Sequence, residues 1–328
     1  MHALSSVPCL PEAASTPVGA EVYRGLTAFP KRLAPWLFYD QRGSELFEAI
    51  TALPEYYLTR TEHAIFAEYG DEILAAASGD GKLAIIELGA GTAAKTGLLL
   101  AAAVRRQERV SYYPIDISVS ALEAGRTRIG EEMPQVVVRP IVADYTTELD
   151  EIPTPGGRRL VLYIGSSIGN FEPAEAAALL RRLRTQLPPG DLLLLGVDHI
   201  KNRNTLLPAY NDMAGVTAEF NRNILTRIRR ELGATFRPRL FRHRACWNDR
   251  ESRIEMHLES LIQQEILIPA LDLTVTFRRG ESIHTENSYK FTPDSVANLV
   301  TRSGFAVERA WTDAKNWFGV YLAEAVAG

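Results

Sequence analysis

The stretch AIIELGAGTAAKT, residues 84–96, decides the fold. It joins an apolar run to the acid Glu87, and then places Gly89 and Gly91 one residue apart, ahead of small side chains. A short apolar run that ends at glycine indicates a buried parallel strand, and glycines behind it let a ligand approach the bare backbone. The stretch is therefore a candidate nucleotide-binding turn between a strand and a helix.

The same stretch limits which nucleotide can bind. A triphosphate-binding P-loop needs glycine directly before its lysine, but Ala94 precedes Lys95 and Thr96 here, so a P-loop is excluded. Residues 89–94 fit the dinucleotide pattern GxGxx(G/A), and Asp116 stands where a dehydrogenase carries its ribose-binding acid. A dinucleotide therefore stays open at this point.

Strands and helices alternate along the chain on both sides of this turn. Gly/Pro punctuation and apolar runs predict five strands with helices between them. The expected strands cover residues 82–89, 110–118, 135–145, 158–167 and 191–200, and the helices cover 93–106, 120–133 and 172–187. Such alternation predicts a parallel sheet with right-handed crossovers.

The C-terminal part of the chain distinguishes between two classes of such sheets. A helix over residues 292–304 and a hairpin over 305–325 complete a seven-stranded sheet, which is typical of Rossmann-like methyltransferases rather than dehydrogenases. Residues 201–290 form an insertion after the fifth strand. We expect an α/β fold with two domains, a Rossmann-like methyltransferase core (61–200 and 291–328) and an α+β substrate-binding domain (1–60 and 201–290).

Acids at the ends of three successive strands favour S-adenosylmethionine as the ligand. Glu87, two residues before the first glycine, makes the E-L-G-x-G pattern of that cofactor's site. Asp116 would hold the ribose hydroxyls, and Asp144 with Tyr145 would meet the adenine. Glu87 or Asp144 alone is more often a helix cap or a solvated loop acid, but three acids at the ends of three successive strands indicate a ligand without phosphate.

Composition restricts the partners and the compartment. The formal net charge of −4 over 328 residues gives no electrostatic reason to expect nucleic acid or an anionic membrane. Cys9 and Cys246 cannot build a disulfide framework, and no spacing of cysteine or histidine suggests a metal site. We therefore expect a cytoplasmic monomer that binds small molecules and has no metal.

Four further stretches carry a resemblance to a known family. They are LPEYYLTRTE (53–62), IGSSIGN (164–170), AYNDMAGVTAEFNRN (209–223) and TENSYKF (285–291). In this order they resemble the histidine-specific Nα-methyltransferases of ergothioneine biosynthesis. The resemblance runs from about residue 20 to the C-terminus and implies that the chain converts histidine to hercynine, its trimethylated betaine, with three molecules of S-adenosylmethionine.

The resemblance also implies a set of site residues. Together with the glycine turn, it places cofactor-binding residues at Glu87, Gly89, Gly91, Lys95, Asp116, Asp144, Tyr145 and Gly165. It places histidine-binding residues at Phe47, Tyr56, Asn170, Tyr210, Met256, Glu286, Asn287 and Ser288. Tyr39 matches a tyrosine near the substrate amine, and we expect it to orient that amine as the catalytic residue.

These residue types suit an amino acid held at both ends. Asn170 and Tyr210 can donate hydrogen bonds to the substrate carboxylate, while Glu286 and Ser288 can bind the two imidazole nitrogens. A spacing of two along a strand puts Glu286 and Ser288 on one face. Without the resemblance, Asn170 is better explained as a turn residue or helix cap, and Glu286 as a solvated acid on an ordinary strand.

Three other interpretations stay open at this stage. One is a methyltransferase of the same class with another substrate, such as a tryptophan derivative or a modified histidine, although an indole would use the pair of Glu286 and Ser288 only in part. The chain can be an NAD-dependent oxidoreductase, or a sensor of S-adenosylmethionine that has no activity. Cofactor binding and a turnover assay distinguish these possibilities.

Overall fold

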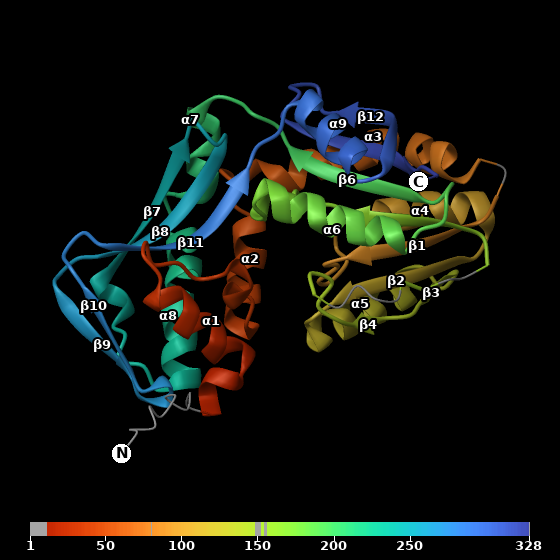
Figure 1. The fold of residues 1–328 in the computed structure, drawn as a ribbon. Coiled ribbons are helices and arrows are strands. Elements are labelled where there is room, and N and C mark those ends of the chain that lie inside the picture. The colour runs from red at the N-terminus through yellow and green to blue at the C-terminus, as the bar shows by residue number, and fades with distance from the viewer. Residues whose placement is uncertain (1–11, 80, 148–151, 154–155, 328) are drawn as a thin grey trace, which may run out of the picture. The chain divides into compact units, whose positions relative to one another are not determined.

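A computed structural model describes residues 12–79, 81–147, 152–153 and 156–327 (Figure 1). The chain divides into two compact units, each built from two segments. The inserted unit comprises Met1–Tyr56 and Asn202–Ser288, and the core unit comprises Tyr57–Lys201 and Tyr289–Gly328. Cys9, one of the two cysteines of the sequence, lies outside the described residues.

No helix in the described ranges is both long and apolar enough to cross a membrane.

The core unit is organised around one sheet with the strand order β12-β13-β6-β5-β1-β2-β3. Strands β6, β5, β1, β2 and β3 pair in parallel, whereas β13 pairs antiparallel with β6 and with β12. The expected parallel sheet with a terminal hairpin is thus confirmed. The strands are β1 (Leu83–Leu88), β2 (Val110–Asp116), β3 (Val136–Val138), β4 (Ile141–Val142), β5 (Arg158–Tyr163), β6 (Leu192–Asp198), β12 (Phe305–Thr312) and β13 (Phe318–Ala325).

One expected strand is broken in two, so the sheet has eight strands instead of seven. Residues 135–145 were expected to form a single strand, but they form β3 and β4, which both pair with β2. Pro140 lies between them and has no N–H to donate to the ladder. The prediction of one continuous strand was wrong for this reason.

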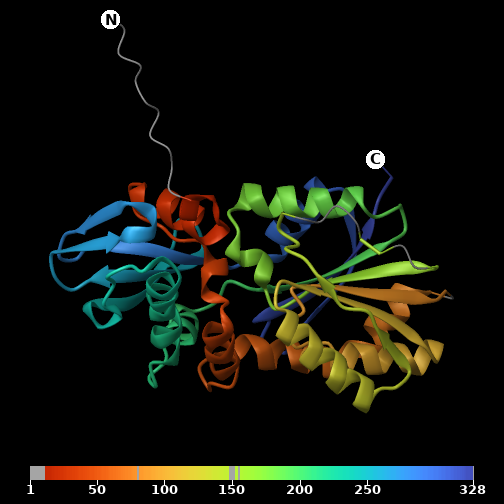
Figure 2. The same ribbon diagram turned by 90° about the horizontal axis from the view of Figure 1, so that it is seen from below.

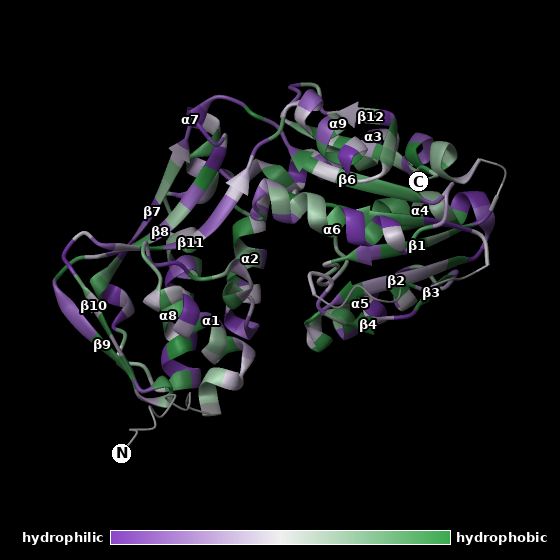
Figure 3. Ribbon diagram, viewed as in Figure 1, coloured by the Kyte–Doolittle hydropathy of each residue, from purple (hydrophilic) through white to green (hydrophobic). Residues whose placement is uncertain are grey.

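Helices cover both faces of the core sheet and bury it. Residues of α3, α4 and α5 pack on one face, and residues of α6 and α9 pack on the other (Figure 2). Every residue of β1 and β6 is consequently buried, and β6 is mostly apolar in Figure 3. The helices are α3 (Tyr57–Ser78), α4 (Gly97–Gln107), α5 (Val119–Glu132), α6 (Pro173–Thr185) and α9 (Pro293–Arg302), with the 3-10 turn η3 (Ser167–Asn170).

The inserted unit combines helices with two small antiparallel sheets, of order β11-β8-β7 and β10-β9. The Asp40 carboxylate caps α2 by accepting the Gly43 N–H at 2.7 Å, and it also accepts from Asn223 of α8 at 2.8 Å. The elements are η1 (Glu12–Ser15), α1 (Pro17–Thr27), η2 (Pro35–Phe38), α2 (Gln41–Thr51), α7 (Arg203–Leu206), η4 (Pro208–Tyr210), α8 (Val216–Leu232), η5 (Pro238–Leu240), β7 (Phe241–Asn248), β8 (Arg253–Ser260), β9 (Gln264–Ile268), η6 (Pro269–Leu271), β10 (Leu273–Phe277) and β11 (Ser282–Tyr289).

Candidate active site

The glycine turn follows β1 at the point where the strand order reverses, between β5 and β2. Parallel sheets bind ligands at the carboxyl ends of their strands at such a point. Gly89 and Gly91 have φ values of +68° and +53°, which disfavour any residue with a Cβ. A Cβ placed on Gly91 would meet no atom within 4 Å, so bare backbone faces open space there.

Asp116, the last residue of β2, holds the turn in this shape. Its carboxylate accepts the Gly91 N–H and the Ser118 N–H, each at 2.8 Å. The carbonyl oxygen of Ile115 accepts the N–H groups of Gly89 and Ala90. Each carboxylate oxygen has a second lone pair, so Asp116 can still accept hydrogen bonds from the hydroxyls of a ribose.

Glu87 supports the turn from inside the core unit. Its carboxylate is buried and accepts hydrogen bonds from Thr96, at 2.6 Å, and from the Tyr112 hydroxyl. Burial raises the pKa of Glu87 to about 7, against the opposing effect of these two hydrogen bonds. Direct contact between Glu87 and the cofactor stays a prediction.

Asp144 and Tyr145 lie in the segment after β4. The Asp144 carboxylate accepts the backbone N–H and the hydroxyl of Thr146, at 2.8 and 2.6 Å. The Tyr145 ring lies against Gly89, because a Cβ on that glycine would be 3.2 Å from the ring. Burial raises the pKa of Tyr145 to about 12, so this residue acts as a neutral wall of the turn.

Lys95 and Gly165 are brought together although 70 positions separate them in the sequence. Gly165 has a φ of +76°, and a Cβ there would be 2.7 Å from the Lys95 Nζ. The absence of a side chain at Gly165 therefore makes room for the ammonium group. Asn170 lies nearby in sequence, at the end of η3.

The inserted unit gathers the aromatic candidates. The Phe47 ring lies 5.8 Å from the Tyr39 ring and 6.3 Å from the Tyr56 ring, which is 6.5 Å from the Tyr210 ring (centroid distances). Phe220 of α8 lies 6.0 Å from both Tyr39 and Phe47 and was missed by the sequence analysis. All of these contacts are edge-to-face except the tilted pair of Phe47 and Phe220, and together they give the unit an aromatic wall.

Strands β8 and β11 carry the remaining candidates of the inserted unit, Met256 on β8 and Glu286, Asn287 and Ser288 on β11. The Ser288 and Tyr210 hydroxyls are 2.7 Å apart, so two residues expected at opposite ends of the substrate are hydrogen-bonded to each other. Met256 is buried, and its carbonyl oxygen accepts from the Thr285 hydroxyl at 3.0 Å. Asn287 is buried and Glu286 is half-buried.

Comparison with known proteins assigns the family. Residues 18–325 match the family described as "Histidine-specific methyltransferase, SAM-dependent". The chain belongs to this family. The resemblance inferred from the sequence is thereby confirmed, and the role of the glycine turn in cofactor binding stays a prediction.

Three relatives illustrate the likeness. Proteins named histidine N-alpha-methyltransferase from Mycolicibacterium smegmatis and Mycobacterium tuberculosis are 43% and 44% identical, over 95% and 92% of this chain and 96% and 93% of their own lengths. Ergothioneine biosynthesis protein 1 of Neurospora crassa is 30% identical over 89% of this chain and 33% of its own length. The likeness to the first two spans nearly the whole of each chain.

A buried acid that contacts Gly165 was not singled out by the sequence analysis. Glu62 of α3 is 1% exposed, and its Oε1 accepts the Gly165 N–H at 2.7 Å. Its Oε2 is also buried and has no hydrogen-bond partner among the described residues. Burial raises the pKa of Glu62, and Lys95 opposes that shift. Its sequence position, in a helix that precedes β1, gives no sign of this contact.

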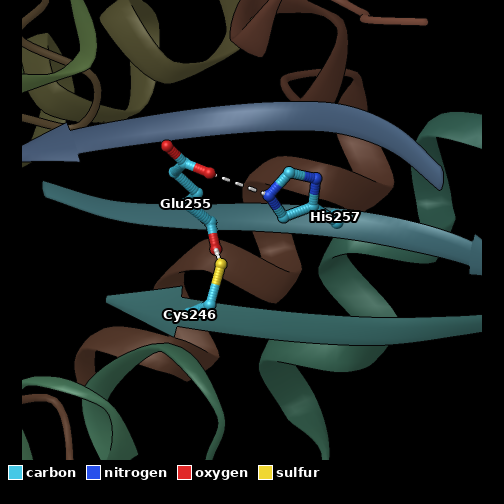
Figure 4. Close-up of side chains that lie close together, drawn as sticks. All are labelled: Cys246, Glu255 and His257. Carbon is cyan, nitrogen blue, oxygen red and sulfur yellow. Dashed lines mark hydrogen bonds and ion pairs between the residues drawn. The ribbon is translucent and has the colours of Figure 1, made fainter. Parts of the chain in front are cut away.

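A cluster of potential metal ligands lies on the β7–β8 face of the inserted unit (Figure 4). Ligand atoms of Cys246, Glu255 and His257 lie within 4.8 Å of one another. Although burial opposes it, hydrogen bonds from Asn248, Arg253 and His257 lower the pKa of Glu255 to about 2. A cation there would lie beside the guanidinium of Arg253, so we assign these residues to hydrogen bonding within the sheet.

Proposed function

We propose that the protein transfers methyl groups from S-adenosyl-L-methionine to the α-amino nitrogen of L-histidine, three times. The product is hercynine, which we place in ergothioneine biosynthesis. The observation that carries the proposal is the likeness to two histidine N-alpha-methyltransferases over more than nine-tenths of each chain. Candidate side chains for both ends of histidine are present in the sequence, which supports the same conclusion.

The residues of the core unit fit the cofactor. The open backbone at Gly91 can receive its amino acid part, and Asp116 can accept from the ribose hydroxyls. Lys95 offers a cation for its carboxylate, and Asp144 can accept from its adenine amino group. When bound, the cofactor supplies a methyl group already activated on a sulfonium, and S-adenosyl-L-homocysteine is the product.

The protein's main task is then to position a neutral amine and to exclude water. The amine lone pair forms the N–C bond as the C–S bond breaks, and the nitrogen loses a proton after the first and second transfers. The third transfer leaves a quaternary ammonium with no proton to lose. Tyr39, 37% exposed, is proposed to orient the amine by hydrogen bonding.

The substrate residues divide between the two ends of histidine. We propose that Asn170 and Tyr210 bind its carboxylate, and that Glu286 and Ser288 bind its imidazole. The hydrogen bond between Tyr210 and Ser288 then couples the groups at the two ends. We propose that four further side chains complete the histidine pocket, those of Phe47, Tyr56, Met256 and Asn287.

We also propose that the protein acts as a monomer in the cytoplasm.

A panel of substrates tests the proposal. The protein is incubated with S-adenosylmethionine and each of the twenty amino acids in turn, and products are examined by mass spectrometry. The proposal expects methylated histidine as the dominant product. Dominant methylation of tryptophan or another amino acid would contradict the substrate assignment, and binding of NAD without S-adenosylmethionine would contradict the reaction class.

A further inference from the structure

Asp198 is a buried carboxylate at the end of β6, close to every point where the chain passes between its two units. The chain passes between the units after Tyr56, after Lys201 and after Ser288. Tyr57, Lys201 and Lys290 are residues of the core unit that lie within two positions of one of these points. All three bind the Asp198 carboxylate.

The contacts are direct and lie within the core unit. The Tyr57 hydroxyl donates to Asp198 Oδ2 at 2.7 Å, and the Lys290 ammonium is 2.8 Å from the same oxygen. The Lys201 ammonium binds Oδ1 and also donates to the Tyr57 hydroxyl at 2.9 Å. One carboxylate therefore joins three segments that are far apart in the sequence.

Stability alone does not account for this group of charges. The side chains of Asp198, Lys201 and Lys290 are 0%, 5% and 0% exposed, so two ammonium groups share one carboxylate away from water. Burial lowers the pKa of Lys201 to about 8, although Asp198 opposes that shift. Buried ion pairs are often no more stabilising than apolar side chains of the same shape.

Asp198 is also connected to the loop that carries Asn170. Its backbone N–H donates to the Ser166 hydroxyl at 2.9 Å, directly before η3. In the same loop, a Cβ on Gly169 would be 2.8 Å from the Tyr289 carbonyl oxygen. The backbone at Tyr289, directly after Ser288, therefore packs closely against the backbone of Gly169. Close packing thus fixes the chain after Ser288 beside this loop.

We propose that Asp198 is a positioning residue for the amino acid substrate. It fixes Tyr57 next to the site residue Tyr56, Lys290 two positions after Ser288, and the loop that ends in Asn170. Asp198 thus fixes core-unit residues that lie next to candidate substrate residues in the sequence, through its carboxylate for Tyr57 and Lys290 and through its backbone N–H for the loop of Asn170. Asp198 itself touches neither substrate nor cofactor, and the inference rests on the proposed function.

Two matched pairs of variants test the inference. Asp198→Asn is compared with Asp191→Asn, because Asp191 is a buried, ion-paired carboxylate directly before the other end of β6. Tyr57→Phe is compared with Tyr321→Phe, because each change removes one buried, hydrogen-bonded hydroxyl group: that of Tyr57 binds Asp198 and Lys201, and that of Tyr321 is 2.9 Å from His199 Nε2. Thermal unfolding, cofactor affinity by calorimetry, and KM and kcat for histidine are measured for all four.

The expected result is a rise in the histidine KM of about tenfold or more in Tyr57→Phe and Asp198→Asn, with a smaller change in kcat and nearly unchanged cofactor affinity. The controls should change thermal stability but leave the histidine KM unchanged. If Asp198→Asn does not fold, the comparison of Tyr57→Phe with Tyr321→Phe tests the inference by itself. An unchanged KM in Tyr57→Phe, or an equal rise in Tyr321→Phe, would overturn the inference. A wild-type protein without histidine turnover would overturn the proposed function as well.

Discussion

Replacing Asp116 by asparagine should weaken S-adenosylmethionine binding through the shape of the glycine turn. The two oxygens of Asp116 each accept a backbone N–H, from Gly91 and from Ser118, at 2.8 Å. An asparagine keeps one oxygen and places an NH2 group against the other N–H, where both groups are donors. One of the two hydrogen bonds is lost, and the remaining one no longer has a negatively charged acceptor.

The magnitude follows from the kind of bond that is lost. A hydrogen bond to a charged group contributes about 1.5–3 kcal/mol, and about 1.4 kcal/mol changes a dissociation constant tenfold. Because the turn must keep its shape to bind the cofactor, Asp116→Asn should raise the Kd by roughly ten- to a hundredfold. Loss of a bond to the ribose would add to this effect.

Isothermal titration calorimetry with S-adenosylmethionine provides the measurement. Asp71→Asn is the control, since Asp71 is an exposed acid of the same unit that pairs with Arg105. Its Kd should match that of the wild type. A Kd for Asp116→Asn within about twofold of the wild-type value, well below the change predicted above, would refute the reasoning that Asp116 shapes the cofactor site.

Three further predictions concern other residues of the site. Glu286→Ala should lower the ratio of kcat/KM for histidine to that for phenylalanine by about ten- to a hundredfold, since a charge-assisted bond is lost; an unchanged ratio would show that Glu286 does not recognise the ring. Glu87→Gln should remove one contribution to the pH dependence of the free energy of unfolding. The pKa of Glu87 is about 7 in the folded protein and 4.5 in the unfolded chain, so deprotonation of this residue destabilises the wild type by about 3 kcal/mol as the pH rises between these two values, and the variant lacks this loss. Denaturant unfolding at pH 5 and pH 8 checks this, and parallel curves for the two proteins would contradict it. Gly165→Ala should weaken cofactor binding, because φ is +76° and the new Cβ would be 2.7 Å from the Lys95 Nζ; calorimetry showing wild-type affinity would contradict that.

Local patterns in the sequence were enough to predict the core sheet. Buried parallel strands are continuous apolar runs, so residues 82–89 and 191–200 predicted β1 and β6 closely. The break between β3 and β4 was missed because apolar residues, Val136–Val138 and Ile141–Val142, lie on both sides of Arg139 and Pro140, although a proline interrupts the hydrogen bonding of a strand. The chain passes from one unit to the other at residues 56/57, 201/202 and 288/289, and the boundaries predicted from the sequence are 60/61, 200/201 and 290/291.

Contacts between distant segments could not be predicted in the same way. Glu62 reaches Gly165 across 103 positions, and Tyr57 reaches Asp198 across 141. Neither pair has a spacing that a local pattern can detect, because such contacts depend on the strand order of the whole sheet. The cluster of Cys246, Glu255 and His257 was missed for a similar reason, since it needs the antiparallel register of β7 and β8.

The most direct test of the central claim locates the methyl groups on the product. Histidine and an excess of S-adenosylmethionine carrying a deuterated methyl group are incubated with the protein, and the product is fragmented by tandem mass spectrometry. The proposed function predicts three labelled methyl groups, all lost with the α-nitrogen as trimethylamine, and an unlabelled imidazole fragment. A labelled imidazole fragment would contradict it, because histidine would then bind with its ring towards the methyl donor.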